Sequence, residues 1–96
     1  MKIKDFVVVR TYSAGVFIGN LEKFEGKEAF LSNAIRIRYW DGANSLSQLA
    51  MEGVKKPENC QFAIPVNEIY LSEVIEIIPT TKIAEKILKG VAAWKQ

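Results

Sequence analysis

The first forty residues contain three strand-forming stretches with almost no chain between them, and this spacing constrains the fold more than any other feature. Residues 6–12, 16–24 and 28–40 are rich in β-branched and aromatic side chains, which are typical of strands. Tight turns at residues 13–15 and 25–27 join the stretches, so we predict an antiparallel meander. A ferredoxin-like sandwich needs a helix between its first two strands, and residues 13–15 leave no room for one. That fold is the weaker alternative.

The rest of the chain adds two helices and further strand. Ser45 followed by Gln48 forms a capping box, with Asn44 as a competing cap, and Gly53 is a natural helix end. After these come a polar loop, a short strand at 62–64 before Pro65, one long strand at 68–78, and a helix that begins at Thr80 or Thr81 and ends at Gly90. The predicted order is β-β-β-α-β-β-α.

This order predicts an α+β, mainly β domain. We expect a small, strongly bent antiparallel sheet, in the form of an SH3-like or Sm-like partly open barrel, with the two helices over its open face or ends. The third strand is expected to bend near Ser32 and Asn33, and Gly19 marks a bulge or a close backbone approach. Residues 1–96 are predicted to be one domain, with a core at 5–89 and a short tail at 90–96.

Composition and charge exclude several classes of function. The chain has no histidine, one cysteine and a formal net charge of +2. Histidine is the usual general base near neutral pH and the commonest transition-metal ligand, so Ser-His-Asp and Cys-His catalysis are excluded. A net charge of +2 is too small for a protein that binds long duplex nucleic acid through electrostatic attraction alone. We therefore expect no enzyme activity, no cofactor and no metal.

Apolar runs and cysteine usage indicate the compartment. Residues 1–5 lack the apolar run of a signal peptide, and no segment reaches the roughly 20 apolar residues of a membrane span. Cys60 has no second cysteine to pair with, and a thiol without a histidine partner is more often inert than reactive. We expect a cytoplasmic protein without a membrane partner.

Alternation along the third stretch predicts a binding surface. Because side chains of a strand point to opposite faces in turn, Arg36, Arg38 and Trp40 are expected to share one face with Ala34. The other face, with Ile35, Ile37 and Tyr39, is assigned to the core. The two guanidinium groups are then about 7 Å apart and in line with the indole. Arginine suits phosphate or carboxylate and an indole stacks on a flat ring, so this face is predicted to bind an anion that carries a ring.

Two further groups are expected beside this face. Arg10 and Tyr12 repeat the pairing on the first strand, with the Ser13 hydroxyl next to them, and the helix start offers backbone N–H groups to an anion. The candidate ligand-binding residues are Arg10, Tyr12, Ser13, Arg36, Arg38, Tyr39, Trp40, Asn44, Ser45 and Gln48. The alternative is a solvated strand face, with its arginines paired to Glu28, Glu68 or Glu76 across the sheet and Trp40 as a lid on the core.

Several segments together resemble a known family. They are Val7–Val16 (VVVRTYSAGV), Tyr39–Ala43 (YWDGA), Ser45-Leu46, Leu49-Ala50, Glu68-Ile69, Leu71 and Glu73–Thr80. In these segments the chain resembles a small uncharacterised domain encoded mainly in tailed-phage genomes, over residues 6–81. The hairpin that begins at Asp5–Val9 is also faintly similar to the trp RNA-binding attenuation protein family, whose rings hold a small ligand between subunits. None of that family's ligand or RNA residues can be matched here.

The resemblance and the arginine face together give the functional expectation. A bent sheet leaves edges and apolar residues, such as Phe17, Phe30, Phe62 and Trp94, that favour pairing with copies of the same chain. We expect a non-enzymatic homo-oligomer of phage type that holds a small anionic ligand, with a nucleotide as the leading class. Sequestration of a host nucleotide defence signal, in the host cytoplasm, would be its role. The alternatives are a single-stranded RNA- or DNA-binding Sm-like module and a structural or protein-interaction module with no small ligand.

Overall fold

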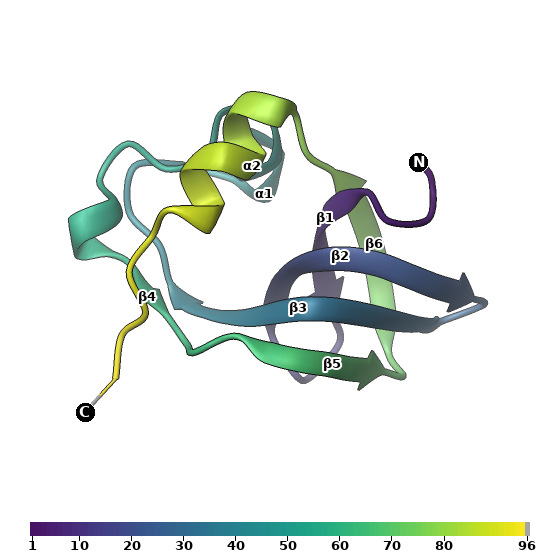
Figure 1. The fold of residues 1–96 in the computed structure, drawn as a ribbon. Helices are drawn as coiled ribbons and strands as arrows, with labels where there is room; N and C mark the ends of the chain where they lie inside the picture. Colours follow the sequence, from purple (N-terminus) through teal and green to yellow (C-terminus); the bar gives the residue numbers. More distant parts are fainter. Residues whose placement is uncertain (96) are drawn as a thin grey trace.

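A computed structural model describes residues 1–95 and confirms a mainly β, α+β fold in the predicted order (Figure 1). The elements are β1 (Phe6–Thr11), β2 (Val16–Glu25), β3 (Glu28–Tyr39), α1 (Leu46–Glu52), the 3-10 turn η1 (Pro57–Asn59), β4 (Gln61–Phe62), β5 (Val66–Leu71), β6 (Val74–Pro79) and α2 (Lys82–Lys89). Within residues 1–95, neither helix has the length and apolar character needed to cross a membrane.

The strands form one antiparallel, strongly bent sheet. Its order is β4-β3-β2-β1-β6, and β5 pairs with the half of β3 that β4 leaves open. Figure 1 shows β1 and β6 crossing the direction of β3 and β5, so the sheet curls toward a barrel. Strands β5 and β6 lie on opposite edges and do not pair with each other. The barrel is therefore partly open, as predicted.

The single strand expected at residues 68–78 is two strands. β5 ends at Leu71 and β6 begins at Val74, with Ser72 and Glu73 forming the turn between them. The residues on both sides of this turn are apolar and strand-forming. The turn itself contains no glycine or proline, so the sequence does not mark the break. Tertiary pairing marks it instead, because β5 pairs with β3 while β6 pairs with β1.

A bulge bends β3 at the predicted place. Asn33 has a positive φ of 50°, and the register between β2 and β3 shifts between Ile18 and Asn20. Gly19 lies opposite, where an added Cβ would come within 3.0 Å of the Ser32 carbonyl oxygen. The bulge therefore needs a glycine beside it, and it sets which residues after Asn33 face each side of the sheet.

The sheet has a core on each face. Val7 and Val9 of β1 pack on one side with Phe17, Leu21 and Leu31. Phe6 and Val8 point the other way and pack under the helices. Burial on both faces explains why β1 reads as a continuous apolar run instead of an alternating one. Phe17 and Phe62, which we expected to be left partly uncovered, are fully buried inside these cores.

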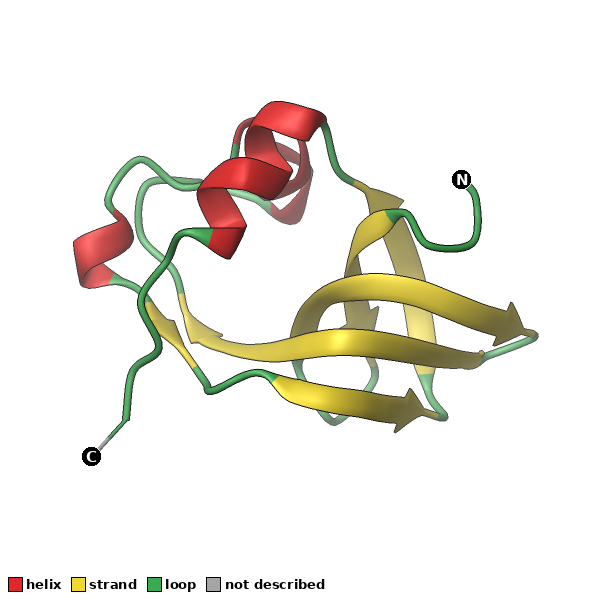
Figure 2. Cartoon of the chain, in the orientation of Figure 1, coloured by secondary structure: helices red, strands yellow, loops and turns green. Residues whose placement is uncertain are grey.

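The two helices lie together on one side of the sheet (Figure 2), where Leu49 and Leu88 share a core with Phe6 and Val8. Ser45 caps α1, and its Oγ accepts a hydrogen bond from the Gln48 N–H at 3.1 Å. Thr81 caps α2 in the same way, through the Ala84 N–H at 3.0 Å. Gly53 ends α1 with a positive φ and lies against Ile87 of α2. The predicted Ser45 cap is confirmed, whereas the Gln48 side chain bonds the Asn44 N–H in place of the Ser45 N–H that a capping box requires.

The segment after α2 is more than a tail. Val91 is buried, Ala93 forms a parallel bridge with Phe62, and the Trp94 N–H donates to the Phe62 carbonyl at 2.7 Å. We call residues 91–95 the C-terminal strap. It runs along the free side of β4 and places Trp94 at this end of the sheet.

Candidate anion-binding surface

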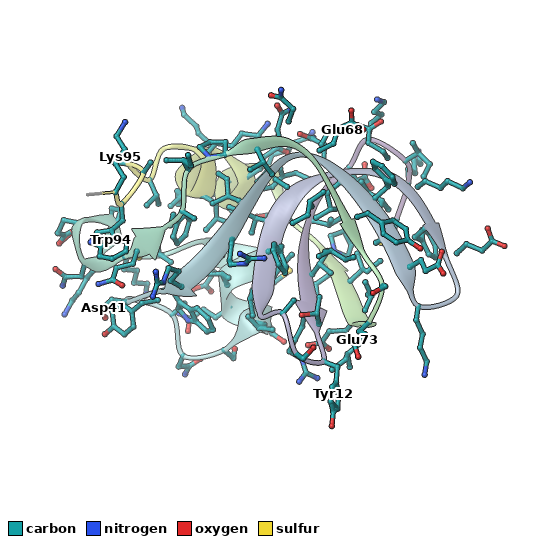
Figure 3. The ribbon with its side chains drawn as sticks, turned by 90° about the horizontal axis from the view of Figure 1, so that it is seen from below. Tyr12, Asp41, Glu68, Glu73, Trp94 and Lys95 are labelled. Atoms are coloured by element: carbon teal, nitrogen blue, oxygen red, sulfur yellow. The ribbon has the colours of Figure 1, made fainter. Side chains whose placement is uncertain are left out.

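The candidate residues separate into three regions of the molecule. Arg36, Arg38 and Tyr39 lie on the second half of β3; Trp40, Asn44, Ser45 and Gln48 lie around the start of α1; and Arg10, Tyr12 and Ser13 lie at the turn between β1 and β2. Figure 3 shows Trp94, which contacts Arg38 of the first region, far from Tyr12 of the third. The ten residues predicted from the sequence therefore do not form one binding site.

Arg36 and Arg38 are brought together as predicted. Both are exposed on the same side of β3, about 7 Å apart along the strand. The Arg36 guanidinium lies 4.9 Å from the ring centroid of Phe17, and that of Arg38 lies 5.3 Å from the indole of Trp94. Neither forms a salt bridge with a carboxylate of residues 1–95. Two cations are thus held in place by aromatic rings, with their charge unmatched.

A small apolar pocket adjoins Arg36. It has a volume of about 190 Å³. Ala34 lies on the same side of β3 as Arg36, since the two are two residues apart in the strand. The lining residues are Phe17, Ala34, Arg36, Ala63, Ile64, Val66 and Ile69. Arg36 is the single polar side chain among them, so the pocket offers one charge at its rim and hydrocarbon elsewhere.

Trp94 supplies the ring that we assigned to Trp40. Its indole stacks with Arg38 and remains 40% exposed. The sequence predicts for Trp94 only an apolar side chain that the domain leaves partly uncovered. The residues around Trp94 give no local sign of where it packs, because the strap is placed beside β3 by its bridge to β4, which lies about thirty residues earlier in the sequence.

Trp40 does not share the face of the arginines, and that prediction is wrong. β3 ends at Tyr39, so strand alternation no longer applies to the next residue. The indole packs against the core under the helices, and its Nε1–H donates to the Ala43 carbonyl at 3.2 Å. Trp40 is the lid on the core that we weighed as the alternative. Tyr39, assigned both to the core and to the ligand, is 53% exposed on the strand end.

At the start of α1, the N–H groups of Asn44 and Gln48 are hydrogen-bonded to neighbouring side chains. The Gln48 N–H is taken by Ser45, and the Gln48 side-chain Oε1 accepts from the Asn44 N–H at 2.9 Å. α1 has only seven residues, which makes its dipole short. Asn44, Ser45 and Gln48 therefore serve to begin the helix, and their place in the predicted site is not supported.

Arg10 lies on the wrong face and already has a partner. Directly paired residues of neighbouring strands share a face, and Arg10 pairs with Val16, which pairs with Ile37 of the core under the helices. Arg36, next to Ile37, points to the opposite side. The Nε of Arg10 donates to Glu76 at 2.9 Å, which is the kind of cross-sheet pairing that the solvated-face alternative expects of a strand arginine.

Tyr12 and Ser13 meet acidic neighbours. The Ser13 hydroxyl donates to a carboxylate oxygen of Glu73 at 2.6 Å. Tyr12 is 76% exposed and borders an open hollow of about 660 Å³ with Lys27, Glu73 and Ile75. A carboxylate beside the hydroxyls disfavours an anion there, so these residues do not extend the arginine surface.

Cys60 offers no chemistry to the surface. The thiol is buried, and burial raises its pKa above the usual value. Its sulfur accepts a hydrogen bond from the Asp41 N–H at 3.4 Å. Across residues 1–95, histidine, cysteine and carboxylate side chains nowhere gather in a group of three that would hold a metal ion.

Comparison with known proteins gives a family without an assigned role. No curated protein and no solved structure matches the chain. The sequence model of one family does match, and it spans β1 to α2, including Arg36, Arg38 and the pocket but not Trp94. With residues 4–88 matched, the chain belongs to the family described as a domain of unknown function (DUF6948), in agreement with the uncharacterised small domain expected from the sequence.

Proposed function

We propose that this protein is a non-enzymatic binding protein that holds an anionic ligand on Arg36 and Arg38. One observation carries the proposal: both guanidinium groups are exposed and stacked on aromatic rings, and neither has a carboxylate partner among residues 1–95. An arginine side chain on a solvated face, without such contacts, normally samples several rotamers. Held in place, it loses less side-chain entropy when it binds a phosphate or carboxylate.

A nucleotide is the first ligand to consider. Its phosphates would pair with the two arginines, and its base would stack on the exposed side of the Trp94 indole. If the domain is phage-encoded, as the sequence resemblance implies, capture of a host nucleotide signal in the host cytoplasm is the role that fits such a binder.

We further propose that copies of the chain associate. The open barrel leaves one edge of β5 and one edge of β6 without a partner strand in the described part of the chain, and unpaired edges favour pairing between copies. A ring of subunits, of the kind that the faint hairpin likeness implies, would multiply the net charge of +2.

Calorimetry with a panel of mono- and dinucleotides tests the proposal. Arg36→Ala and Arg38→Ala should each weaken binding by about 1.5–3 kcal/mol, the value of a charge-assisted hydrogen bond. Arg10→Ala is the matched control, because Arg10 is an exposed strand arginine on the other face, paired with Glu76. Wild-type protein that binds no anion, or an Arg10→Ala effect as large as the other two, would refute the proposal.

Single-stranded nucleic acid is the second candidate. The surface is open, with Trp94 at its rim, so a strand could pass across it instead of ending in it. This candidate predicts that affinity falls steeply with salt. A mobility-shift series with a short oligonucleotide at increasing salt would separate it from a single bound nucleotide.

A further inference from the structure

Three residues on one side of β3 form what we call the binding row, and their side chains differ in charge and polarity. Arg38, Arg36 and Ala34 follow one another at intervals of two residues on one side of the strand, which places them about 7 Å apart. The first two present cations at the surface, and the third is a buried residue that lines the apolar pocket. A ligand that lies along this row therefore meets charge, charge and hydrocarbon in that order.

The pocket fits one apolar side chain. Its 190 Å³ exceeds the roughly 150 Å³ of a cavity that takes a benzene ring, and it is smaller than the roughly 300 Å³ or more of a pocket that encloses a whole small molecule. A leucine, isoleucine or phenylalanine side chain matches this space. A nucleotide base would lose hydrogen bonds there, because Arg36 is the only polar side chain that lines it.

An extended protein segment has the matching spacing. In an extended chain, residues i, i+2 and i+4 lie on one face at intervals of about 7 Å. Carboxylates at i and i+2 would meet Arg38 and Arg36 in the fork geometry that arginine favours, and an apolar side chain at i+4 would enter the pocket. A nucleic acid strand carries a phosphate at every step, and among residues 1–95 a single partly exposed ring, that of Trp94, lies against an arginine of this row to stack with its bases.

We infer that the partner of this surface is an extended acidic segment of another protein, with the pattern acidic-x-acidic-x-apolar. The inference rests on the proposed anion-binding function, because it uses the same two guanidinium groups. It adds the pocket as the element that selects the ligand, and it makes the partner a protein.

The test uses a Glu-x-Glu-x-Leu peptide, with serine or threonine at x, titrated into labelled full-length protein by NMR. Shifts are expected at Arg36, Arg38, Ala63 and Ile64. Changing the peptide leucine to serine, or the protein by Ala63→Leu to fill the pocket, should weaken binding by about tenfold or more, as expected for loss of one buried apolar side chain. Ala14→Leu, on an exposed turn outside the pocket, and a Lys-x-Lys-x-Leu peptide are the controls.

The outcomes separate the two proposals. If nucleotides bind through the arginines but the peptide does not, the inference falls and the proposed function stands. If a single-stranded oligonucleotide binds and Ala63→Leu leaves its affinity unchanged while the peptide fails, nucleic acid replaces the protein partner. If no anion binds, both proposals fall. Because the leucine is changed in the peptide as well as the pocket in the protein, a poorly folded Ala63→Leu variant cannot obscure the result.

Discussion

Single residues in this protein differ in role because of what lies across the sheet. Arg10 and Arg36 are both exposed strand arginines, but Glu76 neutralises the first and the Phe17 ring supports the second. The pairing of strands made this difference. Residue type alone predicted the same role for both.

Glycine at the turn after β3 illustrates a steric requirement at the same scale. Gly42 has a φ of 90°, and an added Cβ would lie 2.5 Å from the Lys55 backbone nitrogen and 2.6 Å from that of Lys56. Gly15 has a similar φ of 100° with open space around it. Both need a backbone conformation that disfavours other residues, but only Gly42 also needs the absence of a side chain.

Gly42→Ala should therefore destabilise the fold more than Gly15→Ala. Gly15→Ala should cost about 1–2 kcal/mol, the strain of a positive φ, whereas Gly42→Ala adds a backbone clash and should cost about 3 kcal/mol or more. Urea unfolding followed by circular dichroism measures both. Equal costs for the two variants would mean that the contact of Gly42 with residues 55 and 56 is not tight.

At the scale of elements, the helix caps do structural work that the sequence signalled. Ser45 caps α1 through one hydrogen bond to the Gln48 N–H. Thr81 accepts from the Ala84 N–H of α2, and its hydroxyl also donates to the Met51 carbonyl of α1 at 2.8 Å. Thr81 thus joins the two helices, while Ser45 serves only its own.

Thr81→Ala should cost more stability than Ser45→Ala. Loss of a cap costs about 1 kcal/mol, and Thr81→Ala also leaves the Met51 carbonyl without its donor, which adds about 1 kcal/mol. Thr81→Ser keeps the hydroxyl and should restore most of the loss. Thermal unfolding measures these effects. Ser45→Ala should leave anion binding unchanged, and a large loss of binding would restore the helix start to the site.

Strand β6 is an edge that the fold partly protects. Phe6, Val8 and Arg10 of β1 direct their backbone groups toward β6, so alternate residues of β6, including Ile77 and Pro79, direct theirs outward. Proline has no N–H to offer at such a position, and the register shift opposite Arg10 and Thr11 breaks the pairing at the other end. The part of this edge that can still pair with another strand is short, and its outward N–H and C=O groups belong to Ile77.

For the whole molecule, the proposed association of copies would depend on exposed apolar side chains beside this short edge. Ile75 is 49% exposed and Tyr12 76% exposed, and both border the same hollow. Burial of such side chains at a shared edge would stabilise a pair of copies by about 25 cal/mol for each Å² of apolar surface removed from water.

Ile75→Lys should therefore shift the protein toward smaller species in native mass spectrometry, because a lysine at an edge opposes pairing. Ile83→Lys is the control, since Ile83 is 70% exposed on α2, away from the sheet edge. Wild-type protein that stays monomeric at high concentration would refute association. An Ile83→Lys effect equal to that of Ile75→Lys would move the interface from β6 to the helices.

The sequence by itself determined the features that depend on near neighbours. Alternation gave the strands and placed Arg36 and Arg38 on one side, the capping box gave the start of α1, and Asn33 with Gly19 gave the bend in β3. Each follows from hydrogen bonds or steric contacts that local geometry fixes, so no knowledge of the rest of the chain was needed.

Only the tertiary structure decided what surrounds those residues. The break between β5 and β6, the Glu76 partner of Arg10, the inward packing of Trp40 and the arrival of Trp94 beside Arg38 all depend on which strands pair and where the strap docks. Such contacts join residues far apart in sequence. Burial of apolar surface drives them without regard to direction, so a local pattern names the residues available for a site but not their neighbours.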